Sequence, residues 1–193
     1  SESQRIELFA ASQRFRADIL LGGNGADSLF GEDDGDVIFG EANDDQISGG
    51  NGDDGLAPGA GNDTITDGGS NDYLDGGLGF DFITFASASS GVTVDLAQTG
   101  DQAIGGGMGT DTLVNFEGII GSAFADTLKG DGVHNVLISA GAGNDVILDG
   151  PGNDYLDGGG GFDVVSFANA SSGVTVNLAL TGDQTVGGGM GTD

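Results

Sequence analysis

Residues 22–83 read, in consecutive blocks, GGNGADSLF, GEDDGDVIF, GEANDDQIS, GGNGDDGLA, PGAGNDTIT, DGGSNDYLD and GGLGFDFI. An aspartate recurs at every ninth position, and a large aliphatic residue follows each aspartate after one intervening residue. The pairs are Asp27 with Leu29, Asp36 with Ile38, Asp45 with Ile47, Asp54 with Leu56, Asp63 with Ile65, Asp72 with Leu74, and Asp81 with Ile83. Self-similarity at a short fixed period predicts a repeat architecture in place of an ordinary globular core.

Each block combines a turn with a very short strand. The first six residues are rich in glycine, which reaches positive φ without steric cost, and only the last three residues can form a strand. Two blocks then make one coil of 18 residues, so alternate blocks stack on the same side. We expect an all-β, parallel β-roll solenoid with a core of two aliphatic columns, one starting at Leu29 and the other at Ile38.

The same stacking places the aspartates in two rows. Asp27, Asp45, Asp63 and Asp81 are expected along one outer edge of the roll, and Asp36, Asp54 and Asp72 along the other. Carboxylates from successive coils, together with main-chain carbonyls of the glycine turns, supply the hard oxygen ligands that calcium prefers, whereas magnesium demands a tighter octahedron. The metal ligands predicted along the whole chain are Asp27, Asp36, Asp45, Asp54, Asp63, Asp72, Asp81, Asp111, Asp126, Asp145, Asp154 and Asp163.

The composition agrees with a cation as the partner. The chain has 41 glycines, and its 31 acidic residues against four lysines and arginines give a formal net charge of −27. Self-repulsion of this size opposes a compact state and disfavours nucleic acid or an acidic lipid surface as a partner. Intrinsic disorder is the alternative for such a composition, and we assign it to the calcium-free form. The chain has no cysteine and no apolar run of membrane-spanning length, so neither disulfides nor membrane insertion are expected.

A second, longer period divides the chain. Residues 71–111 recur as 153–193, with 32 of 41 positions identical. We expect an N-terminal cap or junction at 1–17, a first calcium-binding array at 18–84, a spacer with one nonapeptide (Asp111 and Leu113) at 85–120, a second array at 121–166, and a second, truncated spacer at 167–193. The spacer segments FITF, VTVDL and DTLVNF suit strands that continue the coil. The chain reads as an internal fragment of a longer tandem array.

The second array is less regular than the first. Asn135 stands where a ligand aspartate is expected, and the step from Asn135 to Asp145 is one residue too long. We expect a β-bulge near Ile138 or Ser139, the weakest calcium site around Asn135, and the strongest sites between Asp45 and Asp81.

From about residue 18 onward, the repeated motif resembles the RTX family of calcium-binding β-rolls. The segments SGVTVDLA and FEGIIGSAFADTL resemble the spacers that join nonapeptide blocks in long members of that family. The resemblance implies calcium-dependent folding outside the cell, in a bacterial protein exported by type I secretion.

Two functions fit this pattern. The first is a non-enzymatic folding module, extender or surface scaffold of a secreted protein, with calcium and neighbouring repeats as its partners. The second is an accessory module of a secreted hydrolase, lyase or epimerase whose catalytic domain lies outside this sequence. Carbohydrate or cell-surface contact is a further candidate. We expect no catalytic site here, because the paired aspartates follow from the repeat spacing and Lys129 is the only lysine or arginine beyond position 16.

Overall fold

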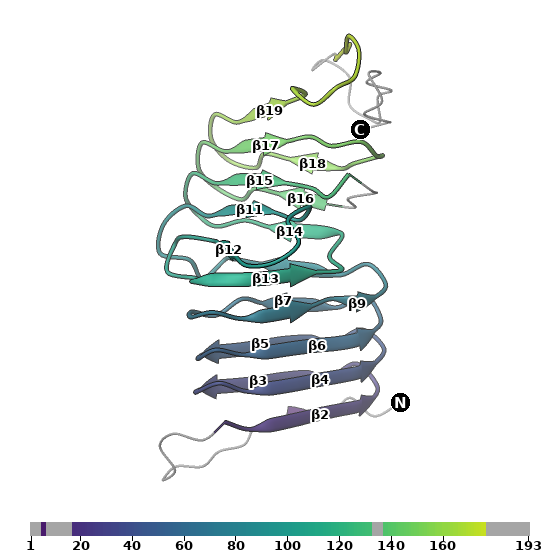
Figure 1. Ribbon diagram of the computed structural model, residues 1–193, viewed down its shortest axis with the longest axis vertical. Helices are drawn as coiled ribbons and strands as arrows, with labels where there is room; N and C mark the ends of the chain where they lie inside the picture. The colour runs from purple at the N-terminus through teal and green to yellow at the C-terminus, as the bar shows by residue number, and fades with distance from the viewer. Residues whose placement is uncertain (1–4, 7–16, 133–136, 177–193) are drawn as a thin grey trace.

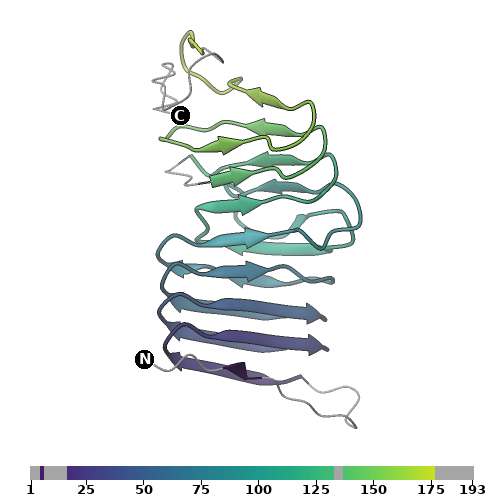
Figure 2. The same ribbon diagram turned by 180° about the vertical axis from the view of Figure 1, so that it is seen from behind.

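The computed structural model describes residues 5–6, 17–132 and 137–176, and every element in this part of the chain is a β-strand. The strands stack as a parallel β-solenoid that rises from β2 to β19 (Figures 1 and 2). The all-β roll predicted from the nine-residue period is therefore confirmed. Within the described residues there is no helix of the length and apolarity needed to cross a bilayer.

Three sheets form the walls of the solenoid. One sheet runs through the whole stack, with the strands β1 (Arg5–Ile6), β3 (Ser28–Asp33), β5 (Gln46–Asn51), β7 (Thr64–Thr66), β10 (Phe82–Thr84), β14 (Gly118–Ile120), β16 (Leu137–Ser139) and β18 (Leu156–Asp157). The opposite wall begins as β2 (Ile19–Asn24), β4 (Val37–Ala42), β6 (Gly55–Ala60), β8 (Tyr73–Asp75), β13 (Thr110–Val114) and β12 (Gln102–Ala103), and β9 (Gly77–Leu78) also pairs with β6. A third sheet continues that wall with β11 (Thr93–Asp95), β15 (Thr127–Lys129), β17 (Val146–Leu148) and β19 (Val164–Ser166).

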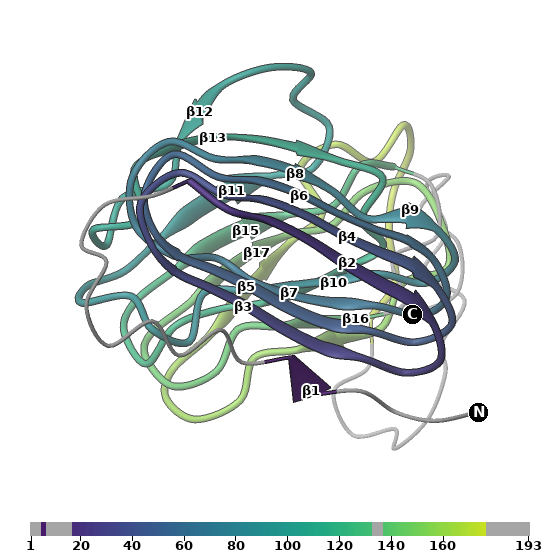
Figure 3. The ribbon, with the colours of Figure 1, turned by 90° about the horizontal axis from the view of Figure 1, so that it is seen from below.

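In the first array, one coil takes 18 residues, as the paired nonapeptides predict. Ile47 pairs with Leu29 on one side and with Ile65 on the other, and Leu56 lies between Ile38 and Leu74 in the opposite sheet. Viewed along the stack, successive coils superimpose as two facing layers (Figure 3). The two aliphatic columns between these layers are 3% exposed or less, and they comprise Leu20, Leu29, Ile38, Ile47, Leu56, Ile65, Leu74 and Ile83.

The turns use the backbone conformation that the glycine pattern predicts. Asp34, Asn43 and Ser70 replace glycine at the fourth position of their repeats, and their φ angles are 78°, 80° and 103°. Asparagine and aspartate tolerate this left-handed region better than other residues with a Cβ. The substitutions therefore leave the coil path unchanged.

The spacer continues the stack, as predicted, but it widens the core. Residues 85–109 carry the chain from β10 through β11 and β12 before β13 returns to stack on β8, and β12 pairs antiparallel with β13. Phe85, Ile104 and Met108 are buried there beside the aliphatic columns. The expectation of a core only two columns wide is therefore wrong beyond the first array, because the third sheet needs apolar side chains of its own.

The predicted bulge at Ile138 or Ser139 is also wrong. Strand β16 is regular: Ile138 is 1% exposed and pairs with both Ile119 and Leu156. Leu128 pairs with Ile147 across a step of 19 residues, so the additional residue lies between Leu128 and Ile138. Ile138 is then the buried aliphatic residue of this repeat. Asn135, the predicted cap at 1–17 except residues 5, 6 and 17, and most of the second spacer lie outside the described residues.

Candidate metal centre

The predicted ligand aspartates form hydrogen-bonded ladders between coils. The backbone N–H of Asp45 donates to Oδ1 of Asp63 at 2.7 Å, and the N–H of Asp63 donates to Oδ1 of Asp81 at 2.8 Å. The same bond joins Asp18 to Asp36, Asp27 to Asp45, Asp36 to Asp54, Asp54 to Asp72, Asp72 to Asp111, Asp126 to Asp145, and Asp145 to Asp163. Each carboxylate therefore holds the coil that precedes it.

The ladder carboxylates are buried, although the sequence predicted them at the outer edge of the roll. Asp45 and Asp63 are 1% and 0% exposed. One oxygen of each makes the ladder bond, but the other, Oδ2, has no hydrogen-bond partner; the same holds for Oδ2 of Asp36, Asp54, Asp81, Asp111 and Asp145. A buried carboxylate oxygen without a donor is costly, because the charge has lost its water.

This burial shifts the acidity of the ladder. Burial, joined by the charges of neighbouring carboxylates, raises the pKa of Asp45 and Asp54 to about 6, against the lowering effect of the ladder hydrogen bond. Burial likewise raises the pKa of Asp81 and Asp111 to about 7. The ladder is therefore unfavourable as a row of bare anions near neutral pH, and a bound cation would remove that cost.

Main-chain oxygens converge on the same carboxylates. A Cβ added to Gly22 would lie 2.8 Å from Oδ2 of Asp27 and 2.8 Å from the carbonyl oxygen of Gly40, one coil further on. The first glycines of the next repeats, Gly31 and Gly40, lie between the same two kinds of oxygen. A carboxylate oxygen and a carbonyl oxygen from the next coil thus face one small space, and any side chain at the first position would fill it.

These oxygen atoms are suitable ligands for calcium. Its coordination sphere consists of about six to eight oxygens from carboxylates, carbonyls and water, in a flexible geometry. The ladder supplies anionic oxygens without donors, and the glycine turns supply carbonyls. Among the described residues, the one ion pair of a lysine joins Lys129 to Asp95, away from the first array.

The other predicted ligands lie in more varied surroundings. Asp111, in the nonapeptide of the spacer, continues the ladder from Asp72, and Asp145 repeats the arrangement of the first array. Asp126 differs, because the backbone N–H and the hydroxyl of Ser122 donate to its two oxygens at 2.6 and 2.7 Å. Asp154 is 4% exposed, and Asp163, at the last described coil, is half-buried.

Sequence reasoning missed Glu117. Its Oε2 accepts the backbone N–H of Asp81 at 2.9 Å, which is the ladder position of the next coil. The signal was present, because Glu117 precedes the buried Ile119 by two residues as each ligand aspartate precedes its aliphatic partner. A glutamate at this position departs from the aspartate of the repeat, which hides the register.

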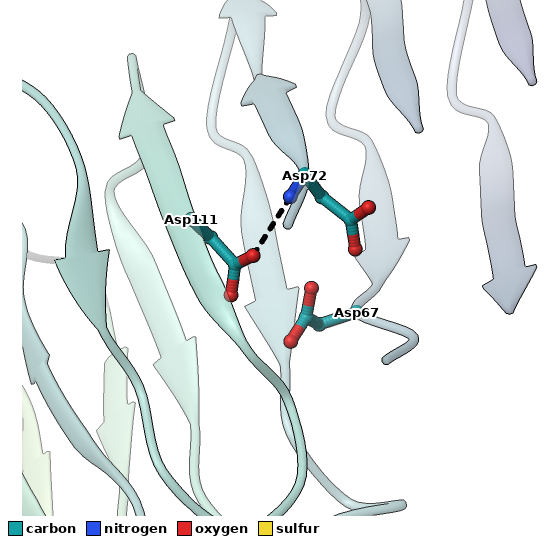
Figure 4. Close-up of side chains that lie close together, drawn as sticks. All are labelled: Asp67, Asp72 and Asp111. Atoms are coloured by element: carbon teal, nitrogen blue, oxygen red, sulfur yellow. Dashed lines mark hydrogen bonds between the residues drawn. The ribbon is translucent and has the colours of Figure 1, made fainter. Parts of the chain in front are cut away.

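Sequence reasoning also missed Asp67 and Asp149. Both stand at the first position of a repeat, where glycine is the rule, and they are 1% and 0% exposed. Asp67, Asp72 and Asp111 each place a carboxylate oxygen within 4.8 Å of the others, and Figure 4 shows the Asp67 carboxylate between the other two. Burial, followed by the charges of Asp111 and Asp72, raises the pKa of Asp67 to about 9. This is the one such three-carboxylate group among the residues that the structure describes.

Comparison with known families supports this reading of the site. The model of the RTX calcium-binding nonapeptide repeat (4 copies) matches residues 21–56, 59–83 and 137–165. The matched ranges include most of the first array and the strands β16, β17 and β18 of the second array. A search of curated proteins finds no match to the chain.

Proposed function

Residues 21–56, 59–83 and 137–165 are calcium-binding nonapeptide repeats of the RTX family, and from this premise we propose that calcium drives the folding of this chain outside the cell. In this proposal, the chain is a non-enzymatic folding module, extender or surface scaffold of a secreted bacterial protein. Its partners are calcium ions and the neighbouring repeats of a longer parent chain.

The observation that carries the proposal is the buried carboxylate ladder. In the first array, aspartates that are at most 5% exposed follow one another from coil to coil, and at Asp36, Asp45, Asp54, Asp63 and Asp81 one oxygen has no donor. The ions would lie between successive coils, held by these oxygens and by carbonyls of the glycine turns. The proposed ligands are the twelve predicted aspartates, with Glu117 added and with Asp126 the least suited because Ser122 already satisfies both of its oxygens.

The size of the effect suits a folding switch. Extracellular modules bind calcium with dissociation constants on the order of 10⁻⁴ M. At roughly millimolar calcium, each such site stabilises the folded state by about 1.4 kcal/mol. Roughly seven sites then contribute on the order of 10 kcal/mol, which equals the whole stability of an ordinary domain. At the far lower calcium concentration of a cytosol the contribution vanishes, so the chain would fold after export.

A calcium titration followed by circular dichroism tests the proposal. We expect the calcium-free chain to lack most of its β signal at neutral pH and to gain it cooperatively as calcium is added. Small-angle scattering over the same titration should show compaction at the same midpoint. A calcium-free sample that already has the full β signal would refute calcium-driven folding.

A further inference from the structure

We propose that Asp67, Asp72 and Asp111 together bind one calcium ion in a three-carboxylate site, at the junction between the first array and the spacer. This site differs from the two-coil sites of the ordinary repeats, because Asp67 brings an additional carboxylate from the first position of its repeat. The inference rests on the proposed function in one respect, the identity of the cation.

The three carboxylates have the spacing of ligands on one ion. Their oxygens lie within 4.8 Å of one another. Two oxygens bound to the same calcium can be at most about 5 Å apart, since each metal–oxygen bond is about 2.3–2.6 Å long. Asp67 follows β7, Asp72 precedes β8, and Asp111 belongs to β13, so three separate segments of the chain meet here (Figure 4).

Asp67 and Asp111 have buried oxygens without hydrogen-bond donors among the described residues. Asp67 is 1% exposed, and within the part of the chain that the structure describes neither of its carboxylate oxygens accepts a hydrogen bond. Oδ2 of Asp111 also has none, whereas Oδ1 of Asp111 accepts the backbone N–H of Asp72 at 2.8 Å. A carboxylate that is buried to this extent beside two others is strongly destabilising unless a cation balances the charge. The burial of Asp67 is therefore an observation that points to a ligand, independently of the clustering.

The position of Asp67 in its repeat explains why the other repeats of the first array have no such three-carboxylate group among the described residues. In the repeats that precede it, the first position is held by Gly22, Gly31, Gly40, Gly49 and Pro58, and in the repeat that follows by Gly76. A Cβ added at any of the four glycines that precede it would lie against Oδ2 of the ligand aspartate five residues later. An aspartate at this position directs a second carboxylate into the same space, here beside Asp72.

The arrangement recurs along the sequence at the long period. Asp67, Asp72 and Asp111 have their counterparts in Asp149, Asp154 and Asp193, each 82 residues later. Asp149 and Asp154 are 0% and 4% exposed, and Asp193 lies outside the described residues. Aspartate thus replaces the consensus glycine in both copies of the long repeat, each time with the same two partner aspartates in sequence. The replacement is therefore a regular feature of the 82-residue unit.

A cation at this point would fasten the spacer to the array. Asp72 and Asp111 are neighbours in the ladder although 39 residues separate them. Ser87 of the spacer donates its hydroxyl to the carbonyl oxygen of Asp67 at 3.3 Å, and Ser87 also contacts the sulfur of the buried Met108. The spacer thus closes over the cluster. Because a higher ligand charge raises calcium affinity, this site should fill before the two-carboxylate sites.

Isothermal titration with calcium alone, on the whole chain at neutral pH, tests the inference. The main variant is Asp67→Gly, which restores the consensus glycine and so should still fold in calcium. Asp67→Asn, which keeps the size of the side chain and removes its charge, is the second variant. Asp33→Asn is the matched control, because Asp33 is an exposed aspartate of the first array outside the ladder. Circular dichroism at saturating calcium measures folding in each sample.

We expect the unaltered chain to bind its first calcium equivalent about tenfold more tightly than the following ones. Asp67→Gly and Asp67→Asn should both lose this tight phase, and Asp67→Gly should bind one calcium fewer while it keeps its β signal. Asp33→Asn should keep the tight phase and the full stoichiometry. If Asp67→Gly retains both, the three-carboxylate site is refuted and Asp67 is a protonated interior residue. Failure of the proposed function differs, because the unaltered chain would then fold without calcium.

Discussion

The first array and the region that follows the spacer compensate buried carboxylates in different ways. In the first array, Oδ2 of Asp45, Asp54 and Asp63 has no hydrogen-bond donor among the described residues. In the region after the spacer, Ser122 satisfies both oxygens of the buried Asp126. Lys129 of that region forms an ion pair at 2.8 Å with Asp95, a half-buried residue of the spacer. The strands differ as well, since β2 to β6 are six residues long and β14 to β19 are two or three. We therefore expect the first array to depend more on a metal ion than the region after the spacer, which partly uses its own hydrogen-bond donors.

Removal of calcium should have the largest effect and should separate the two regions. We expect chelation at neutral pH to cost on the order of 10 kcal/mol and to unfold the chain. During a gradual decrease in calcium, the region after the spacer should lose its protection first, because its sites are fewer and its strands shorter. Hydrogen exchange read by mass spectrometry, peptide by peptide, measures the order. Simultaneous loss in both regions would mean that the solenoid is one cooperative unit.

Acidification should partly replace calcium, and chiefly in the first array. Burial raises the pKa of Asp54 to about 6 and of Asp81 to about 7, from 3.8. A carboxyl group with a raised pKa in the folded state contributes stability that is fully present below the unfolded pKa and is lost as the pH rises through the folded pKa. The β signal of the calcium-free chain should therefore increase as the pH falls from about 7.5 to about 4.5.

Calcium-loaded protein should respond in the opposite direction, because protons compete with the metal for the same oxygens. Its calcium affinity should fall below about pH 6, with the steepest fall in the first array. Circular dichroism of matched calcium-free and calcium-loaded samples measures both trends. A calcium-free β signal that does not change with pH would contradict the burial argument.

Core substitutions should destabilise the protein more in the first array than in the region after the spacer. Ile65 is 0% exposed at the centre of its column, whereas Leu156 is only partly buried against the core. We expect Ile65→Ala to destabilise the calcium-loaded protein by about 4 kcal/mol and Leu156→Ala by about 1 kcal/mol. Urea denaturation at saturating calcium measures both values. Equal losses would show that the second region packs as tightly as the first.

Removal of a carboxylate charge compares a ladder position that shares in two proposed sites with one that shares in a single site. Asp45 accepts from Asp27 and donates its own N–H to Asp63, so it would share in two proposed sites. Asp45→Asn should cost about 3 kcal/mol at roughly millimolar calcium, equal to the loss of two sites. Glu117→Gln should cost about 1 kcal/mol, because Glu117 accepts the N–H of Asp81 and would share in one proposed site. If the exposed control Asp33→Asn costs as much as Asp45→Asn, the two-coil scheme fails.

The nine-residue period made the structure of the first array predictable. Ile138 and Asp67 were not predicted, because the sequence departs from the period or from its consensus at these positions. Nine-residue spacing was enough to place Leu29 above Ile47 and Asp45 beside Asp63, because the period sets both the coil and the register. It could not place Ile138, since a ten-residue step permits the additional residue at several points and only packing against Ile119 and Leu156 decides. Asp67 was missed because a consensus assigns that position to glycine, and its role depends on Asp111, 44 residues further on.

Substitution of Lys129 should have the smallest effect on stability. It tests a carboxylate whose charge is balanced by a side chain and not by a metal ion. Lys129 and Asp95 face each other on the paired strands β15 and β11, and their side chains are 30% and 34% exposed. An exposed ion pair of this kind contributes less than about 1 kcal/mol, so Lys129→Met should cost no more than that. The loss should shrink in high salt, because screening weakens the pair. It should also stay the same at all saturating calcium concentrations, since no ion is needed where the lysine already balances Asp95. A loss that instead grows as calcium is lowered would show that calcium and Lys129 compensate the same carboxylates, and the division between the two regions would no longer hold.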